Sequence, residues 1–101
     1  MDIRLDVSDR AKDDLDEIVF TIATENGKTV AQEWLLRLRH AIFMLRDFPE
    51  LGVRKTRLGR LVRRIVERPY VIYYTFDGTT VRISRVLHGR RKVTRKLLKE
   101  T

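Results

Sequence analysis

Arginine, tyrosine and histidine side chains gather in the second half of the sequence, where they could act on an anionic partner. Arg63 and Tyr74 lie in short apolar runs that are typical of strands, and residues 85–91, with the sequence RVLHGRR, close a third run. Guanidinium groups form paired hydrogen bonds with phosphates and carboxylates, and imidazole exchanges protons near neutral pH. The second half of the chain is therefore where we expect a functional site.

Charge is distributed unevenly along the chain. Residues 1–50 hold 7 Lys or Arg and 11 Asp or Glu, whereas residues 51–101 hold 15 and 3, so the halves carry net charges of −4 and +12. In the second half Arg outnumbers Lys 11 to 4, which favours bidentate contacts. This charge density predicts a nucleic acid, an acidic protein or both as partner, and a solvated sheet face without a partner is the alternative.

Length and composition restrict the class of protein. A chain of 101 residues is long enough for one core and too short for two, so we treat residues 1–101 as a single domain. Cysteine is absent, which excludes disulfides and thiolate metal sites and suits a reducing cytoplasm. The amino terminus has no apolar signal region, and no run approaches the roughly 18 apolar residues of a membrane span. We therefore expect a soluble cytoplasmic protein without a membrane partner.

A strand and a helix are expected near the amino terminus. Residues 2–7 alternate between charged and apolar side chains, as in a half-buried strand. Ser8 offers an N-cap oxygen and Asn26-Gly27 ends the apolar stripe, so a helix is predicted between them. The carboxylates of residues 13–17 are spread around more than one side of this helix, so we expect a solvated face and no metal site.

A second helix follows almost at once. Thr29 and Gln32 have the spacing of a capping box, and Phe48-Pro49 ends the helix. Because only a few residues separate the two helices, they must fold back as an antiparallel hairpin. We expect the apolar stripe of this hairpin to rest on a sheet.

Three further strands are expected in the second half. Residues 61–67, 70–76 and 80–87 are rich in Val, Ile and Tyr, and Asp77-Gly78 predicts a tight hairpin between the last two. These strands should form a meander. Within the first of them Arg63 and Arg64 are consecutive, so their side chains should face opposite sides of the sheet.

The remaining segments are basic. Residues 51–60 are polar and contain two glycines, which predicts an exposed loop. Residues 90–101 should form a basic helix or a frayed strand that touches the core through Val93, Leu97 and Leu98. The predicted fold class is α+β, in the order β-α-α-β-β-β, with an antiparallel four-stranded sheet packed on a helical hairpin. The first strand is placed beside the last.

Several motifs stand in a characteristic order along this chain. They are Asp14-Leu15 in the first helix, the Phe48-Pro49-x-x-Gly52 turn, Arg63 before Pro69-Tyr70, Tyr74, and the ending His88-Gly89-Arg90-Arg91. Together they resemble the RelE/ParE superfamily of toxins from bacterial type II toxin-antitoxin systems. The ending and the long aliphatic hairpin are more similar to the ParE branch, whose members inhibit DNA gyrase, than to the RelE branch, whose members cut messenger RNA on the ribosome.

The resemblance implies different site residues for the two activities. RNA cleavage by a 2′-hydroxyl needs a proton acceptor, a proton donor and cations on the phosphate. The residues assigned to a RelE-like nuclease are His88, Arg85, Arg63 and Glu67. The residues assigned to target binding by a gyrase poison, which needs no covalent chemistry, are Arg82, Arg90, Arg91, Lys92 and Arg95. For His88 a hydrogen-bonded structural role is the alternative.

Departure from the RelE pattern favours the gyrase hypothesis. RelE-like enzymes commonly carry an aromatic residue shortly after the last strand, where this chain has residues 92–94 with the sequence KVT. No cofactor is expected for either activity. A third hypothesis is a basic binding module without toxicity.

The resemblance also implies a cognate antitoxin that neutralises the toxin through its acidic carboxy-terminal segment. A small sheet with open edges beside a helical hairpin suits a segment that adds a strand or lays an amphipathic helix into an apolar groove. The outer seam of the hairpin is the groove we expect. Its predicted contact residues are Trp34, Leu35 and Leu38.

Overall fold

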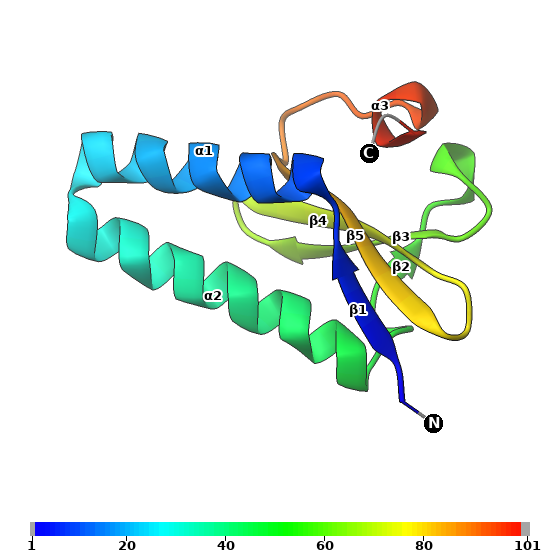
Figure 1. Cartoon of the computed structure of the whole chain (residues 1–101). Coiled ribbons are helices and arrows are strands. Elements are labelled where there is room, and N and C mark those ends of the chain that lie inside the picture. Colours follow the sequence, from blue (N-terminus) through cyan, green and yellow to red (C-terminus); the bar gives the residue numbers. More distant parts are fainter. Residues whose placement is uncertain (1, 100–101) are drawn as a thin grey trace.

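Five strands form one mixed sheet in the order β1-β5-β4-β3-β2, and a two-helix hairpin covers one of its faces (Figure 1). The computed structural model describes residues 2–99. The strands are β1 (Arg4–Val7), β2 (Val53–Arg54), β3 (Val62–Glu67), β4 (Tyr70–Phe76) and β5 (Thr80–His88). The helices are α1 (Asp9–Asn26), α2 (Lys28–Asp47), the 3-10 turn η1 (Thr56–Leu58) and the short α3 (Arg95–Lys99).

The first helix begins where the sequence predicts. Ser8 is the N-cap of α1, and its hydroxyl accepts a hydrogen bond from the Ala11 amide at 3.0 Å. The same hydroxyl donates to the Ser84 carbonyl on β5 at 2.8 Å, so the cap also joins α1 to the sheet. One buried side chain therefore sets both the start of the helix and its position.

The turn between the helices depends on Gly27. Its φ of +96° lies in the region that favours glycine, and its amide donates to the Ala23 carbonyl. Gly27 is also the N-cap of α2, which begins at Lys28 without a side-chain cap. The predicted capping box of Thr29 and Gln32 is therefore wrong, because the one-residue turn places both residues inside the helix.

The first strand pairs with β5 as expected, but in the parallel direction. Leu5 is in register with Val81, and Val7 with Ile83. The predicted all-antiparallel, four-stranded sheet is thus wrong in the direction of β1 and in the number of strands. The parallel direction places Ser8, which directly follows β1, beside Ser84, which directly follows Ile83 on β5, so that α1 begins against the sheet.

Residues 51–60 are more ordered than the predicted loop. Val53 and Arg54 form β2, which pairs antiparallel with β3, and the Lys55 amide donates to the Val62 carbonyl at 2.8 Å. Leu58 in η1 is only 4% exposed. The polar and basic side chains of this segment predicted a loop, but its order comes from backbone hydrogen bonds to β3 and from burial of the Leu58 side chain.

The other three strands agree with the prediction to within a residue. The predicted hairpin between β4 and β5 is confirmed, and the Asp77 carboxylate accepts from the amides of Thr79 and Thr80 at 2.9 and 2.8 Å. These hydrogen bonds lower the pKa of Asp77. An irregularity near the middle of the ladder pairs Tyr73 with Arg85 but Tyr74 with Ile83, so Ser84 is the extra residue of a bulge in β5.

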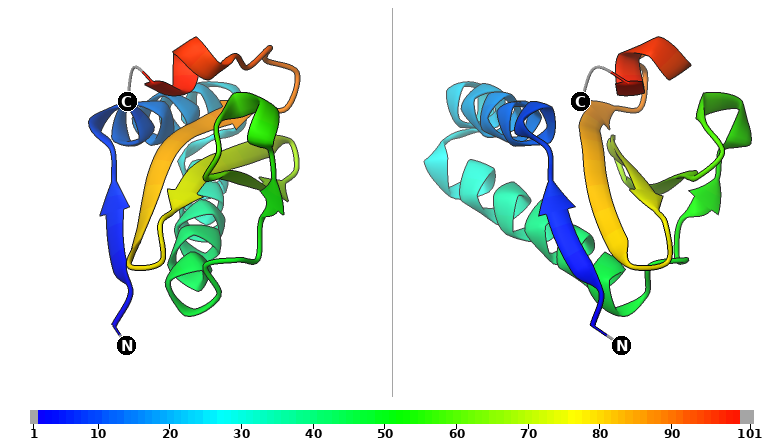
Figure 2. Two further views of the ribbon diagram at one scale, coloured as in Figure 1. Left: turned by 90° about the vertical axis from the view of Figure 1, so that its right-hand side faces the viewer. Right: turned by 45° about the vertical axis from the view of Figure 1, so that its right-hand side comes forward.

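Both faces of the sheet are covered. The first core lies between the sheet and the hairpin; its fully buried residues include Leu38, Leu45, Ile72, Tyr74, Val81 and Ile83. The second core lies on the opposite face, and its residues are Leu58, Val62, Val71, Tyr73, Leu87, Val93 and Leu98. Figure 2 shows η1 and α3 next to each other over this second face.

The tail contacts the second core as predicted. Val93 and Leu98 are buried there and Leu97 packs against them. Glu100 and Thr101, the end of the predicted tail, lie outside the described residues. No helix within residues 2–99 is long and apolar enough to cross a membrane.

Candidate functional site

A cavity of about 380 Å³ lies on the sheet face opposite the hairpin and is lined mainly by cationic side chains. We call it the basic cavity. Its lining residues are Lys55, Arg57, Leu58, Arg64, Tyr73, Gly89, Arg91, Lys92 and Val93. Five of these nine are Lys or Arg and none is acidic, so the cavity is suited to an anion.

Three separate segments bring the cations together. Lys55 and Arg57 come from the segment between β2 and β3, and Arg64 from β3 itself, where it is in register with Tyr73. After β5 the Gly89 amide donates to the Pro69 carbonyl at 2.8 Å, which turns the chain back toward the sheet. This turn positions Arg91 beside the other cavity cations.

Among the described residues, no carboxylate forms an ion pair with a cavity cation. Within residues 2–99 the ion pairs join Arg37 to Glu67, Arg63 to Glu50, Arg82 to Asp6 and Arg85 to Asp14. None of these pairs includes a residue of the basic cavity. The positive charge of the cavity is therefore available to a partner.

The predicted target-binding residues only partly coincide with this cavity. Arg91 and Lys92 line it. Arg82 lies beside β1, where it pairs with Asp6, and Arg90 is exposed with its amide donating to His88 Nδ1 at 3.1 Å. Arg95 on α3 donates to the Arg57 carbonyl at 3.4 Å.

Sequence reasoning missed most of the cavity. Lys55, Arg57, Arg64 and Tyr73 were not among the predicted site residues. Arg63 and Arg64 do face opposite sides of the sheet, and the alternation of β3 was the signal that could have separated them. No pattern in the sequence indicates that residue 64 lies near residues 55 and 91.

Arg85, assigned to the RelE-like site, is buried in the interior. Its guanidinium forms two hydrogen bonds with the Asp14 carboxylate, at 2.7 and 2.9 Å, and the two side chains are 5% and 9% exposed. Asp14 also accepts from the Val86 amide at 2.9 Å. Asp14 therefore caps the edge of β5 where β1 has ended, which corrects the prediction that residues 13–17 form only a solvated face.

Arg63, also assigned to that site, holds the turn after α2. Its guanidinium donates to the carbonyls of Glu50 and Gly52 at 3.1 and 2.9 Å. Tyr74, the register partner of Arg63, donates to the Pro49 carbonyl and accepts from the Gly52 amide, both at 2.8 Å. Burial raises the pKa of Tyr74, which keeps this hydroxyl protonated. The motif residues Pro49, Gly52, Arg63 and Tyr74 thus form one structural unit.

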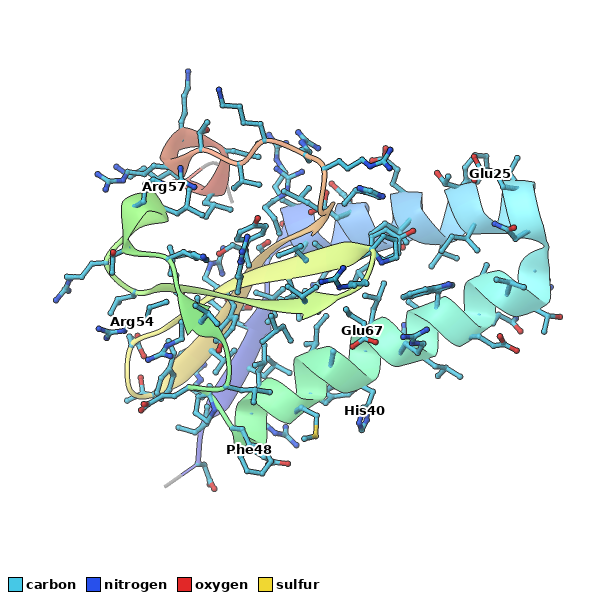
Figure 3. The ribbon with its side chains drawn as sticks, turned by 180° about the vertical axis from the view of Figure 1, so that it is seen from behind. Glu25, His40, Phe48, Arg54, Arg57 and Glu67 are labelled. Carbon is cyan, nitrogen blue, oxygen red and sulfur yellow. The ribbon has the colours of Figure 1, made fainter. Side chains whose placement is uncertain are left out.

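Glu67 and His88 belong to a row of side chains at the other end of the sheet. Glu67 pairs with Arg37 at 2.8 Å, and the Arg37 guanidinium lies 4.2 Å from the centre of the Trp34 ring. Trp34 meets Tyr70 edge to face at 5.3 Å, and Tyr70 meets His88 at 6.1 Å. Figure 3 shows Glu67 directed toward α2, away from Arg54 and Arg57. The four residues assigned to RNA cleavage therefore do not converge on the basic cavity.

A second, apolar depression follows the outer seam of the hairpin. It encloses about 730 Å³ between α1 and α2, and we call it the hairpin groove. Its lining residues are Lys12, Leu15, Asp16, Val19, Phe20, Ala23, Lys28, Ala31, Gln32, Leu35 and Arg39. Phe20 is 72% exposed, which is a large apolar surface to leave in water.

Only one of the three predicted antitoxin contacts lines this groove. Leu35 does. Trp34 is half-buried against Tyr70, and Leu38 is fully buried in the first core. The helical stripe used for the prediction therefore mixed residues that face the sheet with residues that face outward.

Comparison with known proteins gives consistent matches. The sequence model of the family described as "ParE toxin of type II toxin-antitoxin system, parDE" matches residues 5–93. Toxin ParE3 of Caulobacter vibrioides (strain ATCC 19089 / CIP 103742 / CB 15) is 32% identical over 88 residues, which cover 87% of this chain and 88% of that protein. A solved structure described as "Chromosomal ParDE TA system from P. aeruginosa" has the same fold, with a TM-score of 0.75, 20% identity, and coverage of 85% of this chain and 95% of that one.

Proposed function

The chain belongs to the ParE toxin family of type II toxin-antitoxin systems, and we propose that it arrests bacterial growth by poisoning DNA gyrase. The observation that carries the proposal is the basic cavity, whose five cations have no acidic partner within the described chain. Such a surface supports binding to a gyrase-DNA complex by attraction alone.

The positions of the predicted catalytic residues argue against RNA cleavage. A cleaving site needs a proton acceptor and cations around one phosphate. Arg85 is bound to Asp14, Arg63 holds the turn at Gly52, and Glu67 is paired with Arg37. Arg85 and Arg63 are held by contacts within the fold and Glu67 already has a cationic partner, so a binding toxin explains the arrangement better than a nuclease does.

A cognate antitoxin is the second part of the proposal. The hairpin groove offers exposed apolar surface bordered by Lys12, Lys28 and Arg39. This combination suits an amphipathic segment with acidic flanks, which would bury Phe20 and Leu35. We place the toxin and its antitoxin in the cytoplasm, where gyrase and DNA are found.

The proposal is tested by brief induction of the protein in bacteria that lack the antitoxin. We expect growth arrest with protein-linked breaks in the chromosome and with messenger RNA ends unchanged. The exposed side chain of His88 makes His88→Ala a matched variant, and we expect it to arrest growth as the wild type does. New transcript ends that disappear with His88→Ala would instead identify a ribosome-dependent nuclease, and continued growth with folded protein would identify a non-toxic binding module.

A further inference from the structure

We propose that the basic cavity binds the phosphate backbone of duplex DNA, so that the toxin contacts the DNA that gyrase holds. This inference rests on the proposed function and adds to it the partner of one surface. The cavity includes three arginines, Arg57, Arg64 and Arg91, and the guanidinium group matches the geometry of a phosphate with two parallel hydrogen bonds.

Charge continues beyond the cavity, which favours a polyanion over a single phosphate. Figure 3 shows Arg57 projecting into solvent beside η1 and α3, whereas Arg54 is in register with Arg63 and therefore faces the other side of the sheet. Other basic residues of η1's flank and of α3 are exposed; they are Arg60, Lys96 and Lys99. A duplex presents one negative charge about every 1.7 Å along its axis, so it can engage the cavity and these neighbours together.

The floor of the cavity indicates contact with the backbone and not with the bases. Tyr73 is only 5% exposed, so its ring is not free to stack on a base, and Leu58 and Val93 are buried in the second core. Binding without an aromatic platform should therefore depend on salt and not on sequence. An acidic peptide is less well matched here because these apolar groups are already covered and the apolar anchor surface lies in the hairpin groove.

The test measures binding of the purified full-length toxin to a fluorescent 20-base-pair duplex by anisotropy, without gyrase, at several KCl concentrations. We expect a dissociation constant in the range of roughly 10⁻⁴ to 10⁻⁶ M that weakens as salt increases and is equal for unrelated sequences. Arg64→Gln with Arg91→Gln should weaken binding at least about tenfold. The plot of log K against log salt has a negative slope, to which each phosphate contact contributes about 0.9 in magnitude. The double change should therefore make this slope less steep by about two.

Two further variants make the test specific. Lys12→Gln with Arg39→Gln removes the same charge from the hairpin groove, and we expect its binding to stay within about twofold of wild type. Lys55→Gln with Lys92→Gln changes only flexible side chains of the cavity, and it should weaken binding in the same direction as the arginine pair. Circular dichroism checks the fold of each variant.

The proposal is overturned if the duplex does not bind at 50 mM KCl, or if the groove pair weakens binding as much as the cavity pairs do. It is also overturned if the cavity pairs abolish binding of a polyglutamate peptide and leave binding of DNA unchanged. Gyrase poisoning is measured on the same preparations. Poisoning without DNA binding would remove the cavity assignment alone, whereas DNA binding without poisoning would remove the proposed function and leave the cavity assignment standing.

Discussion

At the scale of single residues, the Asp14 carboxylate joins α1 to the edge of β5. It receives two hydrogen bonds from Arg85 and one from the Val86 amide. Asp14→Asn leaves the Arg85 charge buried with a weaker partner, so we expect the free energy of unfolding to fall by about 3–5 kcal/mol in urea. Asp13→Asn, at an exposed position on the same helix, should change it by less than about 0.5 kcal/mol. Equal effects of the two changes would contradict the role of the buried pair.

Gly52 is required by the packing of Tyr74 against the turn after α2. A Cβ atom at position 52 would lie 2.6 Å from Tyr74 Cε1 and Oη, and 2.9 Å from the Arg64 carbonyl oxygen. Backbone on one side prevents relief by a simple side-chain movement. We therefore expect Gly52→Ala to destabilise the protein by about 1–3 kcal/mol in urea unfolding. A variant as stable as the wild type would show that the turn is looser than described.

The Tyr74 hydroxyl should make stability depend on alkaline pH. Burial raises its pKa above the ordinary value of 10.0, so the protonated hydroxyl stabilises the fold below that pH. This contribution is lost as the pH rises through the raised pKa. Tyr74→Phe should reduce the loss between pH 9 and 12, while at pH 7 it costs about 1–3 kcal/mol because the Gly52 amide loses its acceptor. Tyr70→Phe is the comparison, because burial also raises the pKa of Tyr70. This variant should keep the part of the alkaline loss of stability that comes from Tyr74.

At the scale of elements, the hairpin supplies the surface that we assign to the antitoxin. Leu35→Glu places a charge in the hairpin groove and should weaken antitoxin binding at least about tenfold in calorimetry, with growth arrest retained. Leu36→Glu is the matched control, because Leu36 is 66% exposed and does not line the groove. If the change at position 36 disrupts binding and the change at position 35 does not, the antitoxin uses another face.

The elements also show what the sequence could predict. Helix boundaries at Ser8 and Gly27 and the hairpin at Asp77 follow from local chemistry, so they were predicted correctly. The parallel direction of β1, the short β2 and the Asp14–Arg85 pair depend on contacts between residues far apart in the chain. Local patterns do not show which distant residues come into contact. For this reason Arg64 was not among the predicted site residues, although it lines the same cavity as Arg91, which was.

At the scale of the whole molecule, two different surfaces lie on opposite sides of the sheet. The hairpin face has the exposed apolar groove, and the opposite face has the basic cavity with charge around it. The sheet separates these two surfaces, and Figures 1 and 2 show the hairpin on one side of it and η1 with α3 on the other. In the proposed function, one face is therefore open to the gyrase-DNA complex and the other to an antitoxin.

The most direct test incubates the purified toxin with gyrase, ATP and supercoiled plasmid and then adds detergent and protease to reveal trapped breaks. We predict linear plasmid in proportion to the amount of toxin, and less of it with the variant Arg64→Gln, Arg91→Gln than with Lys12→Gln, Arg39→Gln. Plasmid that stays free of breaks at every concentration of folded toxin would contradict the account.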